Sequence, residues 1–156
     1  MRKDTIATRK RIVNAAEKLF AEYGVDNTSL LDISKAAKQK NRSALQYHFK
    51  DKQGLLDAVL DKHAIGIALR RTSMLDQLEA RGNFTLYQLI EALVLPVAAL
   101  LDQKEDGHAF LKIHSQLMTS ESYRELRTHR DQNAPDVLRL QKLMVKHTNS
   151  STPKVV

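Results

Sequence analysis

Apolar residues recur at three- and four-residue steps along nearly the whole chain, and this spacing restricts the fold more than any other feature. Such steps place side chains on one face of an α-helix, whereas a half-buried β-strand requires alternation, which no window sustains. Glycine and proline, which interrupt helices, number only 5 and 3 among the 156 residues. The sequence therefore predicts an all-α fold of one ordinary domain or two small ones.

Capping residues divide the chain into predicted helices. Gly24 ends the first helix, and either Thr28 or Ser29 caps the second. Asn41 and Asp51 are the predicted caps of the third and fourth helices. The predicted helices span, in order, residues 5–23, 30–37, 42–50, 52–80, 85–103, 108–118, 120–130 and 135–146.

Three later features are predicted to limit the remaining helices. Gly82 and Gly107 each separate two helical segments. Pro96 is a site where the helix over 85–103 can bend, because its ring removes a backbone donor. The polar ending HTNSSTPKVV is predicted to fray.

Positive charge is concentrated in the first third of the chain. The formal net charge is +7, and residues 1–52 hold 12 Lys or Arg against 6 Asp or Glu. The rest of the chain is nearly balanced, with 13 against 12. A surplus confined to one segment indicates a surface that binds a polyanion, with a simple solubility surface as the alternative.

Composition excludes several classes of protein. The chain has no cysteine, so disulfides and thiolate metal sites are impossible. Its basic start lacks the apolar core of a signal peptide, and the apolar run 89–101 is interrupted by Glu91 and Pro96. A cytoplasmic location is the expectation that fits these features.

Residues 42–49 divide into two faces when they are placed on a helical wheel. Leu45 and Phe49 share an apolar arc with Ala44, which would attach a short helix to a core. The outward-facing residues are Arg42, Ser43, Gln46 and Tyr47. Arginine can bind guanine through two hydrogen bonds, glutamine can pair with adenine, and hydroxyl groups can reach phosphates.

The surroundings of this helix predict a helix-turn-helix unit. A short helix that follows a capped helix and a turn is typical of such units, in which the second helix enters the major groove. Thr28 can hold a phosphate at the start of the first helix of the pair. Lys52 adds a cation after the second, and the basic residues of the N-terminus can lie along the duplex. The alternative is a polar surface helix that is only solvated.

Three segments resemble the DNA-binding domain of TetR/AcrR-type transcriptional regulators. They are TRKRIVNAAEKLFAEYG, NTSLLDISKAAK and SALQYHFKDKQGLL, within roughly residues 8–60. The matching motif consists of Leu19-Phe20 and Gly24, a Thr28 cap, Tyr47-His48-Phe49 and Lys52. The DNA-binding residues that the resemblance implies are Thr28, Tyr47, His48 and Lys52, mainly on phosphates, and Arg42, Ser43 and Gln46, facing the bases.

Two details affect how the family's residue roles apply to this chain, namely the turn before the third helix and the position of His48. The family turn usually reads Ala-Gly-Val-Ser, whereas here the residues are Ala37-Lys38-Gln39-Lys40-Asn41, without glycine and with one extra residue. This difference bears on the angle of the recognition helix and on which residues contact the bases. His48 falls on the inner arc of the wheel, so phosphate contact and structural packing both remain open for it.

The resemblance also gives expectations for the rest of the chain. Residues 1–52 are expected to form the three-helix DNA-binding domain, and 53–156 a helical bundle that binds a small-molecule inducer and forms a homodimer. Because the chain turns polar after PDVLRLQKLM, the last family helix is expected to be missing, which puts dimerisation in doubt. The ligand-binding candidates are Phe110, His114 and Met118, with a packed core as the alternative.

The sequence contains no motif that predicts catalysis. It has no HExxH pattern, no glycine-rich phosphate loop and no Ser/His/Asp grouping, so neither enzyme activity nor a metal or cofactor is expected. The prediction is a ligand-responsive repressor that reads double-stranded operator DNA in the major groove. The alternatives are a truncated or monomeric remnant of a regulator, and a basic helical adaptor that binds proteins through the apolar faces of the helices over 85–103 and 108–118.

Overall fold

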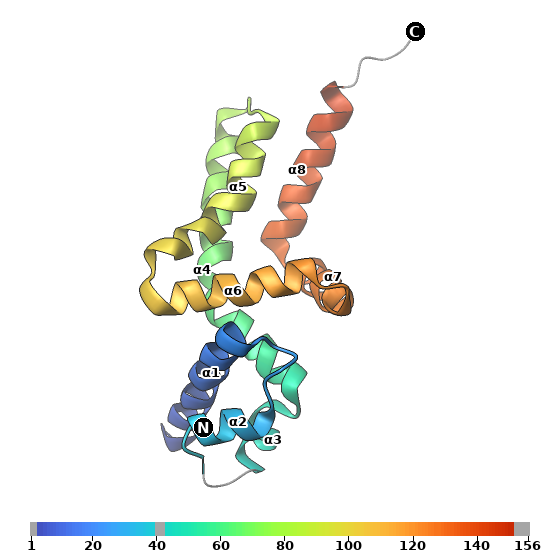
Figure 1. Cartoon of the computed structure of the whole chain (residues 1–156). Helices are drawn as coiled ribbons and strands as arrows, with labels where there is room; N and C mark the ends of the chain where they lie inside the picture. The colour runs from blue at the N-terminus through green and yellow to red at the C-terminus, as the bar shows by residue number, and fades with distance from the viewer. Residues whose placement is uncertain (1–2, 40–42, 152–156) are drawn as a thin grey trace. The chain divides into compact units, whose positions relative to one another are not determined.

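The structure is a computed structural model that describes residues 3–39 and 43–151, and every regular element in these ranges is helical (Figure 1). The elements are α1 (Lys3–Tyr23), α2 (Leu30–Ala36), α3 (Ser43–Phe49), α4 (Lys52–Arg81), α5 (Leu86–Ala98), the 3-10 turn η1 (Ala99–Asp102), α6 (Lys104–Thr119), the 3-10 turn η2 (Glu121–Tyr123), α7 (Arg124–Gln132) and α8 (Pro135–Ser151). The predicted all-α class is confirmed. No helix in the described ranges combines the length and apolar composition that crossing a bilayer requires.

The chain divides into two compact units. Unit 1 contains Met1–Ala64 and Leu101–Thr119, and unit 2 contains Ile65–Leu100 and Ser120–Val156. Helix α4 belongs to both units, and α6 returns the chain to unit 1. The functional boundary predicted at residue 52 stays a prediction.

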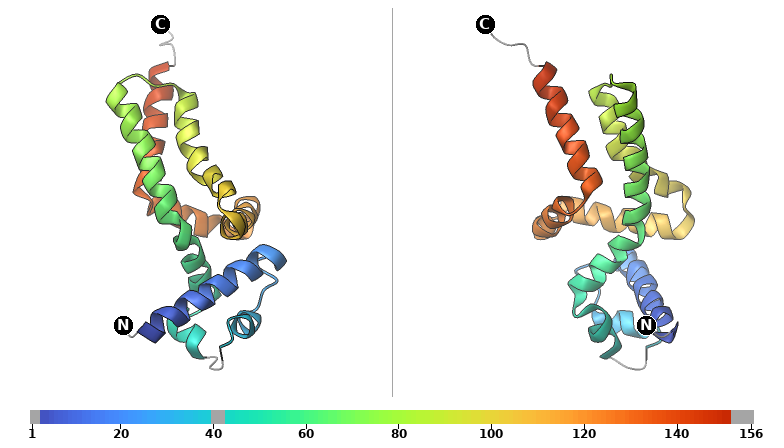
Figure 2. Two further views of the ribbon diagram at one scale, coloured as in Figure 1. Left: turned by 90° about the vertical axis from the view of Figure 1, so that its left-hand side faces the viewer. Right: turned by 180° about the vertical axis from the view of Figure 1, so that it is seen from behind.

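Unit 1 is held together by α1, which packs against both α2 and α6 (Figure 2). The side chains that α1 buries are spaced as the sequence predicts: Ile12, Val13, Ala16 and Phe20 are all at most 6% exposed. Helices α2, α3, α4 and α6 add further buried residues, among them Ile33, Leu45, Phe49, Leu55, Val59 and Ile113. Burial of these side chains is the main force that holds the short helices α2 and α3 in place, because isolated helices of seven residues are unstable in water.

Unit 2 has its own core between the second part of α4, α5 and α8. The buried cluster consists of Leu75, Leu78, Leu89, Ala92, Leu140 and Leu143, with Met74, Phe84 and Met144 packed against it. Thr85 caps α5 through a capping box with Gln88, as favourable helix starts do. Pro135 occupies the first position of α8, where its missing N–H costs nothing.

A buried arginine explains how α5 accommodates a proline in its interior. Pro96 cannot donate to the carbonyl four residues earlier, which belongs to Ala92. The Nε of Arg71 donates to this carbonyl at 3.2 Å, and its Nη2 donates to the Leu93 carbonyl at 3.3 Å. Its Nη1 also binds Asp136 Oδ2 at 2.5 Å, so one side chain connects α4, α5 and α8.

Several predicted helix limits are confirmed. Helix α1 ends at Tyr23, where Gly24 takes a left-handed φ of 92°, and α4 ends at Arg81 before Gly82, whose φ is 74°. Asp51 caps α4, because its Oδ1 accepts from the Gly54 N–H at 2.8 Å. The predicted Asn41 cap lies outside the described residues.

Other predicted limits are wrong. Gly107 does not break a helix but lies inside α6, and its N–H bonds the Gln103 carbonyl at 3.0 Å. The helical penalty of one glycine, about 1 kcal/mol, is smaller than the gain from burying the apolar face of α6. The helix predicted over 85–103 changes to the 3-10 turn η1 after Ala98 rather than continuing to residue 103.

Two further limits near the C-terminus also differ from prediction. The segment after Ser120 begins as a 3-10 turn, and its α-helix starts only at Arg124. Helix α8 continues past the predicted end at residue 146 to Ser151, through a segment whose polar composition suggested fraying. The backbone hydrogen bonds of a helix with a packed face can thus extend through residues of modest propensity.

Candidate nucleic-acid interface

Helix α3 has one buried face and one exposed face, as its sequence predicts. Leu45 and Phe49 are 4% and 5% exposed, whereas the Tyr47 side chain is 81% exposed and Gln46 is also exposed. For the described side chains, the predicted division of this helix is confirmed. Arg42 lies outside the described residues, and for Ser43 only its backbone position at the start of α3 is described.

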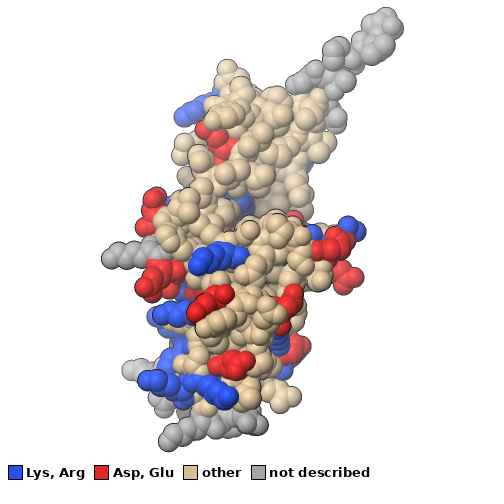
Figure 3. All heavy atoms as spheres, in the orientation of Figure 1, with Lys and Arg blue, Asp and Glu red and all other residues tan. Residues whose placement is uncertain are grey.

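The N-terminal half of α1 brings positive charge next to α3. The Arg9 guanidinium lies over the Phe49 ring, 5.3 Å from its centroid, in a cation–π contact. Arg9, Lys10 and Arg11 are all exposed. In Figure 3, blue Lys and Arg atoms gather over α1 on the face that is shown. The charge surplus of the first 52 residues therefore includes an exposed side chain that contacts α3.

The start of α2 decides between the two predicted caps. Ser29, not Thr28, is the N-cap, and its hydroxyl accepts from the Asp32 N–H at 3.2 Å. The same hydroxyl donates to Asp32 Oδ2 at 2.5 Å, and this hydrogen bond lowers the pKa of the Asp32 carboxyl. Thr28 is buried, and its hydroxyl donates to the Gly24 carbonyl at 2.8 Å and, at 3.3 Å, to Leu19. Its hydroxyl thus fixes the end of α1, and phosphate binding by Thr28 stays a prediction.

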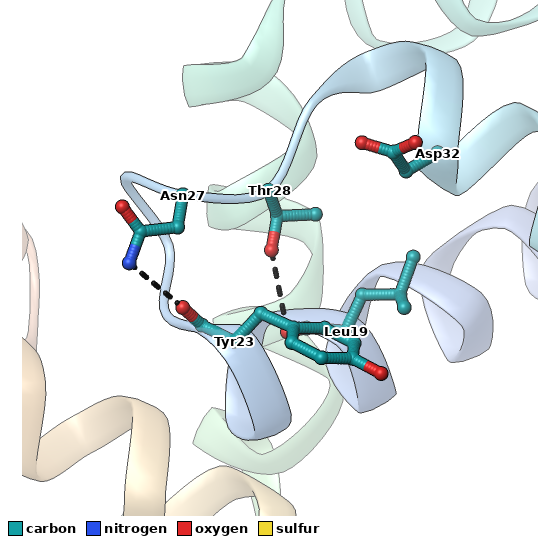
Figure 4. A pocket seen from close by; sticks show the side chains of 5 residues that line it. All are labelled: Leu19, Tyr23, Asn27, Thr28 and Asp32. Carbon is teal, nitrogen blue, oxygen red and sulfur yellow. Dashed lines mark hydrogen bonds between the residues drawn. The ribbon is translucent and has the colours of Figure 1, made fainter.

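A hollow of about 560 Å³ opens between the end of α1, the loop that follows and α2 (Figure 4). Its lining residues are Leu19, Tyr23, Asn27, Thr28 and Asp32. Asn27 Nδ2 donates to the Tyr23 carbonyl at 3.0 Å, and Thr28 is bonded to α1 as described above. These polar side chains hold the loop against α1. None of the three candidate ligand residues lines this hollow.

The two remaining predicted DNA-binding residues lie around the end of α3. The Lys52 Nζ donates to the Asp26 carbonyl at 3.1 Å, so it reaches back to the loop between α1 and α2. His48 is half-buried, with its ring 5.2 Å from the Tyr47 ring and 5.9 Å from the Phe49 ring. Both alternatives for His48 remain open, and the phosphate role of Lys52 stays a prediction.

Helix α6 is connected to the end of α1 and to the loop before α2 by a residue that the sequence did not single out. Gln116 Oε1 accepts from the Val25 N–H at 3.0 Å, and its Nε2 donates to the Phe20 carbonyl at 3.2 Å. One amide therefore bonds both the end of α1 and the loop that leads to α2. The only signal in the sequence is a glutamine next to the apolar face of α6, which is too common to be noticed.

Unit 1 also contains a charged cluster. Glu17 is only 1% exposed and binds His63 Nε2 at 2.6 Å and Lys62 Nζ at 2.5 Å. Lys62 also reaches Asp106 at 3.0 Å. Burial opposes the charge of Lys62, but its hydrogen bonds to Glu17 and Asp106 outweigh this effect and raise its pKa. The Lys62 hydrogen bond lowers the pKa of Asp106.

The candidate ligand residues all lie on α6. Phe110 is buried, with its ring 4.8 Å from the His63 ring and 5.6 Å from the His114 ring, whereas Met118 is 52% exposed. Burial lowers the pKa of His114. The described residues contain no group of three acidic or histidine side chains that could hold a metal ion. Ligand binding by these residues stays a prediction.

Comparison with known proteins gives one consistent result. A family model described as "Bacterial regulatory proteins, tetR family" matches residues 12–59. The HTH-type transcriptional regulator AcrR of Shigella flexneri is 44% identical over 52 residues, which are 33% of this chain and 24% of that protein. The probable HTH-type transcriptional regulator ArpR of Pseudomonas putida is 38% identical over 92 residues, 56% of this chain and 43% of that protein.

A solved structure extends the similarity to most of the chain. It is the crystal structure of NalD, described as the secondary repressor of the MexAB-OprM multidrug efflux pump in Pseudomonas aeruginosa. The TM-score is 0.61 at 27% identity, over 92% of this chain and 68% of that one. The matches to these curated regulators span less than half of the regulators' own length.

Proposed function

Because this chain belongs to the TetR family of bacterial regulatory proteins, we propose that it binds operator DNA and represses transcription. The relatives that it matches are named as transcriptional regulators, and NalD is named as a repressor. Catalysis has no part in this proposal. A cytoplasmic location, where operator DNA is found, goes with it.

The observation that carries the proposal is the exposed face of α3. A helix of seven residues that buries Leu45 and Phe49 while exposing Gln46 and Tyr47 is suited to insertion in the major groove. Gln46 can form two hydrogen bonds with the adenine edge, and the Tyr47 hydroxyl can reach a phosphate. The adjacent charges of α1 supply the attraction to the phosphate backbone that binding of any duplex requires.

The proposed DNA-binding residues keep the roles derived from the sequence. Arg42, Ser43 and Gln46 face the bases, and Thr28, Tyr47, His48 and Lys52 contact mainly phosphates. Lys52 would exchange its hydrogen bond to the Asp26 carbonyl for a phosphate oxygen, which is the stronger acceptor for an ammonium group. The buried Thr28 would act mainly through its backbone and through the position it gives to α2.

The remaining proposals concern regulation. A small molecule would bind the helical region after residue 52, with Phe110, His114 and Met118 as candidates, and a homodimer would place two α3 helices on one operator. A ligand lowers operator affinity only if it binds more tightly to the conformation that does not fit DNA. The two hydrogen bonds of Gln116 connect α6 to the end of α1 and to the α1–α2 loop, and they support such a coupling within unit 1.

The test of DNA binding is selection of bound duplexes from a random pool, followed by anisotropy titration on the enriched site. Gln46→Ala is expected to relax base preference and to weaken binding to that site by about 1–3 kcal/mol. Lys52→Ala is expected to weaken all duplexes alike and to reduce the salt slope by about one unit. Gln141→Ala, an exposed glutamine of α8, is the matched control and should change neither.

The same experiment separates the rival functions. An enriched palindrome bound by two copies of the chain supports a dimeric repressor. Binding without any enriched sequence supports a remnant that contacts phosphates only. No binding at all would favour the protein–protein adaptor, for which α5 offers exposed apolar residues: Leu86, Tyr87, Ile90, Leu93, Val94 and Leu95.

A further inference from the structure

Two lysines in the helix-turn-helix unit adopt a backbone conformation that lysine rarely takes. Lys38 has a φ of 52° and Lys50 a φ of 65°, both in the left-handed region. Outside glycine, these are the positive φ values found in the described parts of the chain. A side chain other than glycine is strained there, because its Cβ approaches the following carbonyl oxygen.

Both lysines end a helix at the position where glycine is usual. After α2, the Lys38 N–H bonds the Lys35 carbonyl at 3.0 Å and the Gln39 N–H bonds the Ser34 carbonyl at 2.9 Å, which is a Schellman motif. After α3, the Lys50 N–H bonds the Gln46 carbonyl at 3.0 Å, which is the simpler left-handed ending. In each case the lysine occupies the residue that must be left-handed.

The same chain uses glycine at the equivalent position of other helices. Helix α1 ends with Gly24 at a φ of 92°, and α4 ends with Gly82 at a φ of 74°. Helices α2 and α3, the two of the helix-turn-helix unit, carry lysine instead. Residues with strained backbone cluster at functional sites, where the surrounding structure holds them in place. The contrast within one chain therefore indicates that the lysine side chains themselves are needed.

The described residues offer no partner for these two side chains. Both lysines are exposed, and neither ammonium group makes a hydrogen bond or ion pair with any residue that the structure describes. A free cation at such a site can be stabilised by a partner outside the chain. Lys38 opens the turn that leads to α3, and Lys50 directly follows α3, so the two cations come before and after this helix along the chain.

We propose that Lys38 and Lys50 are a pair of phosphate-binding residues, one for each strand beside the groove that receives α3; this inference rests on the proposed DNA-binding function. A helix of seven residues is about 10 Å long, close to the width of the major groove, about 12 Å. A lysine at each end of such a helix can reach the phosphates that border the groove.

The test uses variants for which stability and affinity change in opposite directions. Lys38→Gly and Lys50→Gly each remove the strain and are expected to raise Tm by about 2–4 °C. Each also removes one phosphate contact, which should weaken binding about eightfold at roughly 0.1 M salt and reduce the salt slope by about 0.9. Lys38→Arg and Lys50→Arg should retain both the affinity and the original Tm.

Gly82→Lys is the reciprocal control, because a Cβ at this left-handed position meets no atom within 4 Å. It should lower Tm by a similar amount and leave the salt slope on DNA unchanged. Glycine variants with raised Tm but unchanged affinity would overturn the inference, as would glycine variants whose Tm does not rise. If the wild-type chain itself binds no duplex, the proposed function fails. If the wild-type chain binds DNA and the glycine variants bind it equally well, only the inference about Lys38 and Lys50 fails.

Discussion

Replacement of Arg71 by methionine should destabilise unit 2 more than a similar replacement of any other polar side chain that forms contacts in this unit. Arg71 is 5% exposed and Asp136 is 7% exposed, so the pair is shielded from water. The guanidinium binds this carboxylate and the carbonyls of Ala92 and Leu93. Methionine has a similar length and fills most of the same space, so the loss of hydrogen bonds, rather than of volume, determines the effect.

The magnitude follows from what the substitution leaves behind. Removal of one partner of a buried ion pair costs about 3–5 kcal/mol, because the other charge stays buried without compensation. Here the Ala92 carbonyl also loses its donor, and Pro96 cannot replace it. The N-terminus of α8 stabilises Asp136 in part, since helix starts favour acidic groups. We therefore expect about 3–4 kcal/mol, a large share of the roughly 5–15 kcal/mol that stabilises a typical domain.

The assay is urea unfolding followed by far-UV circular dichroism, since the chain has no tryptophan. Arg139→Met is the matched control, because Arg139 also joins α8 to α4, through Asp76 and Glu79, but at the surface. Exposed pairs of this kind contribute less than about 1 kcal/mol. Arg71→Met combined with Asp136→Leu should recover most of the loss, because it removes the uncompensated charge. Equal effects of Arg71→Met and Arg139→Met would refute this reasoning.

Two other predictions concern unit 1. A Cβ on Gly54 would lie 2.2 Å from the Phe49 carbonyl oxygen, so Gly54→Ala should cost about 1–3 kcal/mol in urea unfolding, whereas Gly66→Ala, which meets no neighbour, should be neutral or stabilising. Burial lowers the pKa of His114 in the folded chain, so the unfolded chain binds more protons and stability falls as the pH drops below about 6.5. His114→Gln should therefore show a smaller decrease in urea midpoint between about pH 7.5 and 5.5 than the wild type. The control His129→Gln changes an exposed histidine and should match the wild type. An equal decrease in urea midpoint for all three proteins would contradict the burial of His114.

The local parts of the fold were predictable because local interactions decide them. The periodicity of α1, its glycine ending and the Asp51 cap depend only on residues close in sequence. The failure at Gly107 has the opposite cause, since packing of α6 against α1 outweighs the local preference of one glycine. Thr28 and Ser29 are both good caps, so only the geometry of the loop could decide between them.

The features of the candidate site that arise within one helix were predictable from the sequence, whereas the contacts between different helices were not. The two faces of α3 follow from its wheel, and Gln46 and Tyr47 are exposed as expected. Contacts between distant segments carry no local signal: Gln116 and Val25 are 91 residues apart, and Arg71 and Asp136 are 65 apart. The left-handed Lys38 was signalled only by the missing glycine of the turn.

The Gln116 side chain behaves as an additional peptide group inserted between α6 and the end of α1. Its two bonds can form together only in one register, so a slip of α6 by a single turn would break both. The Val25 N–H is then exchangeable with solvent deuterium whenever α6 separates from α1. The deuterium exchange rate of this single amide therefore reports how often the two helices separate, and an added inducer or operator that alters the coupling would change this rate.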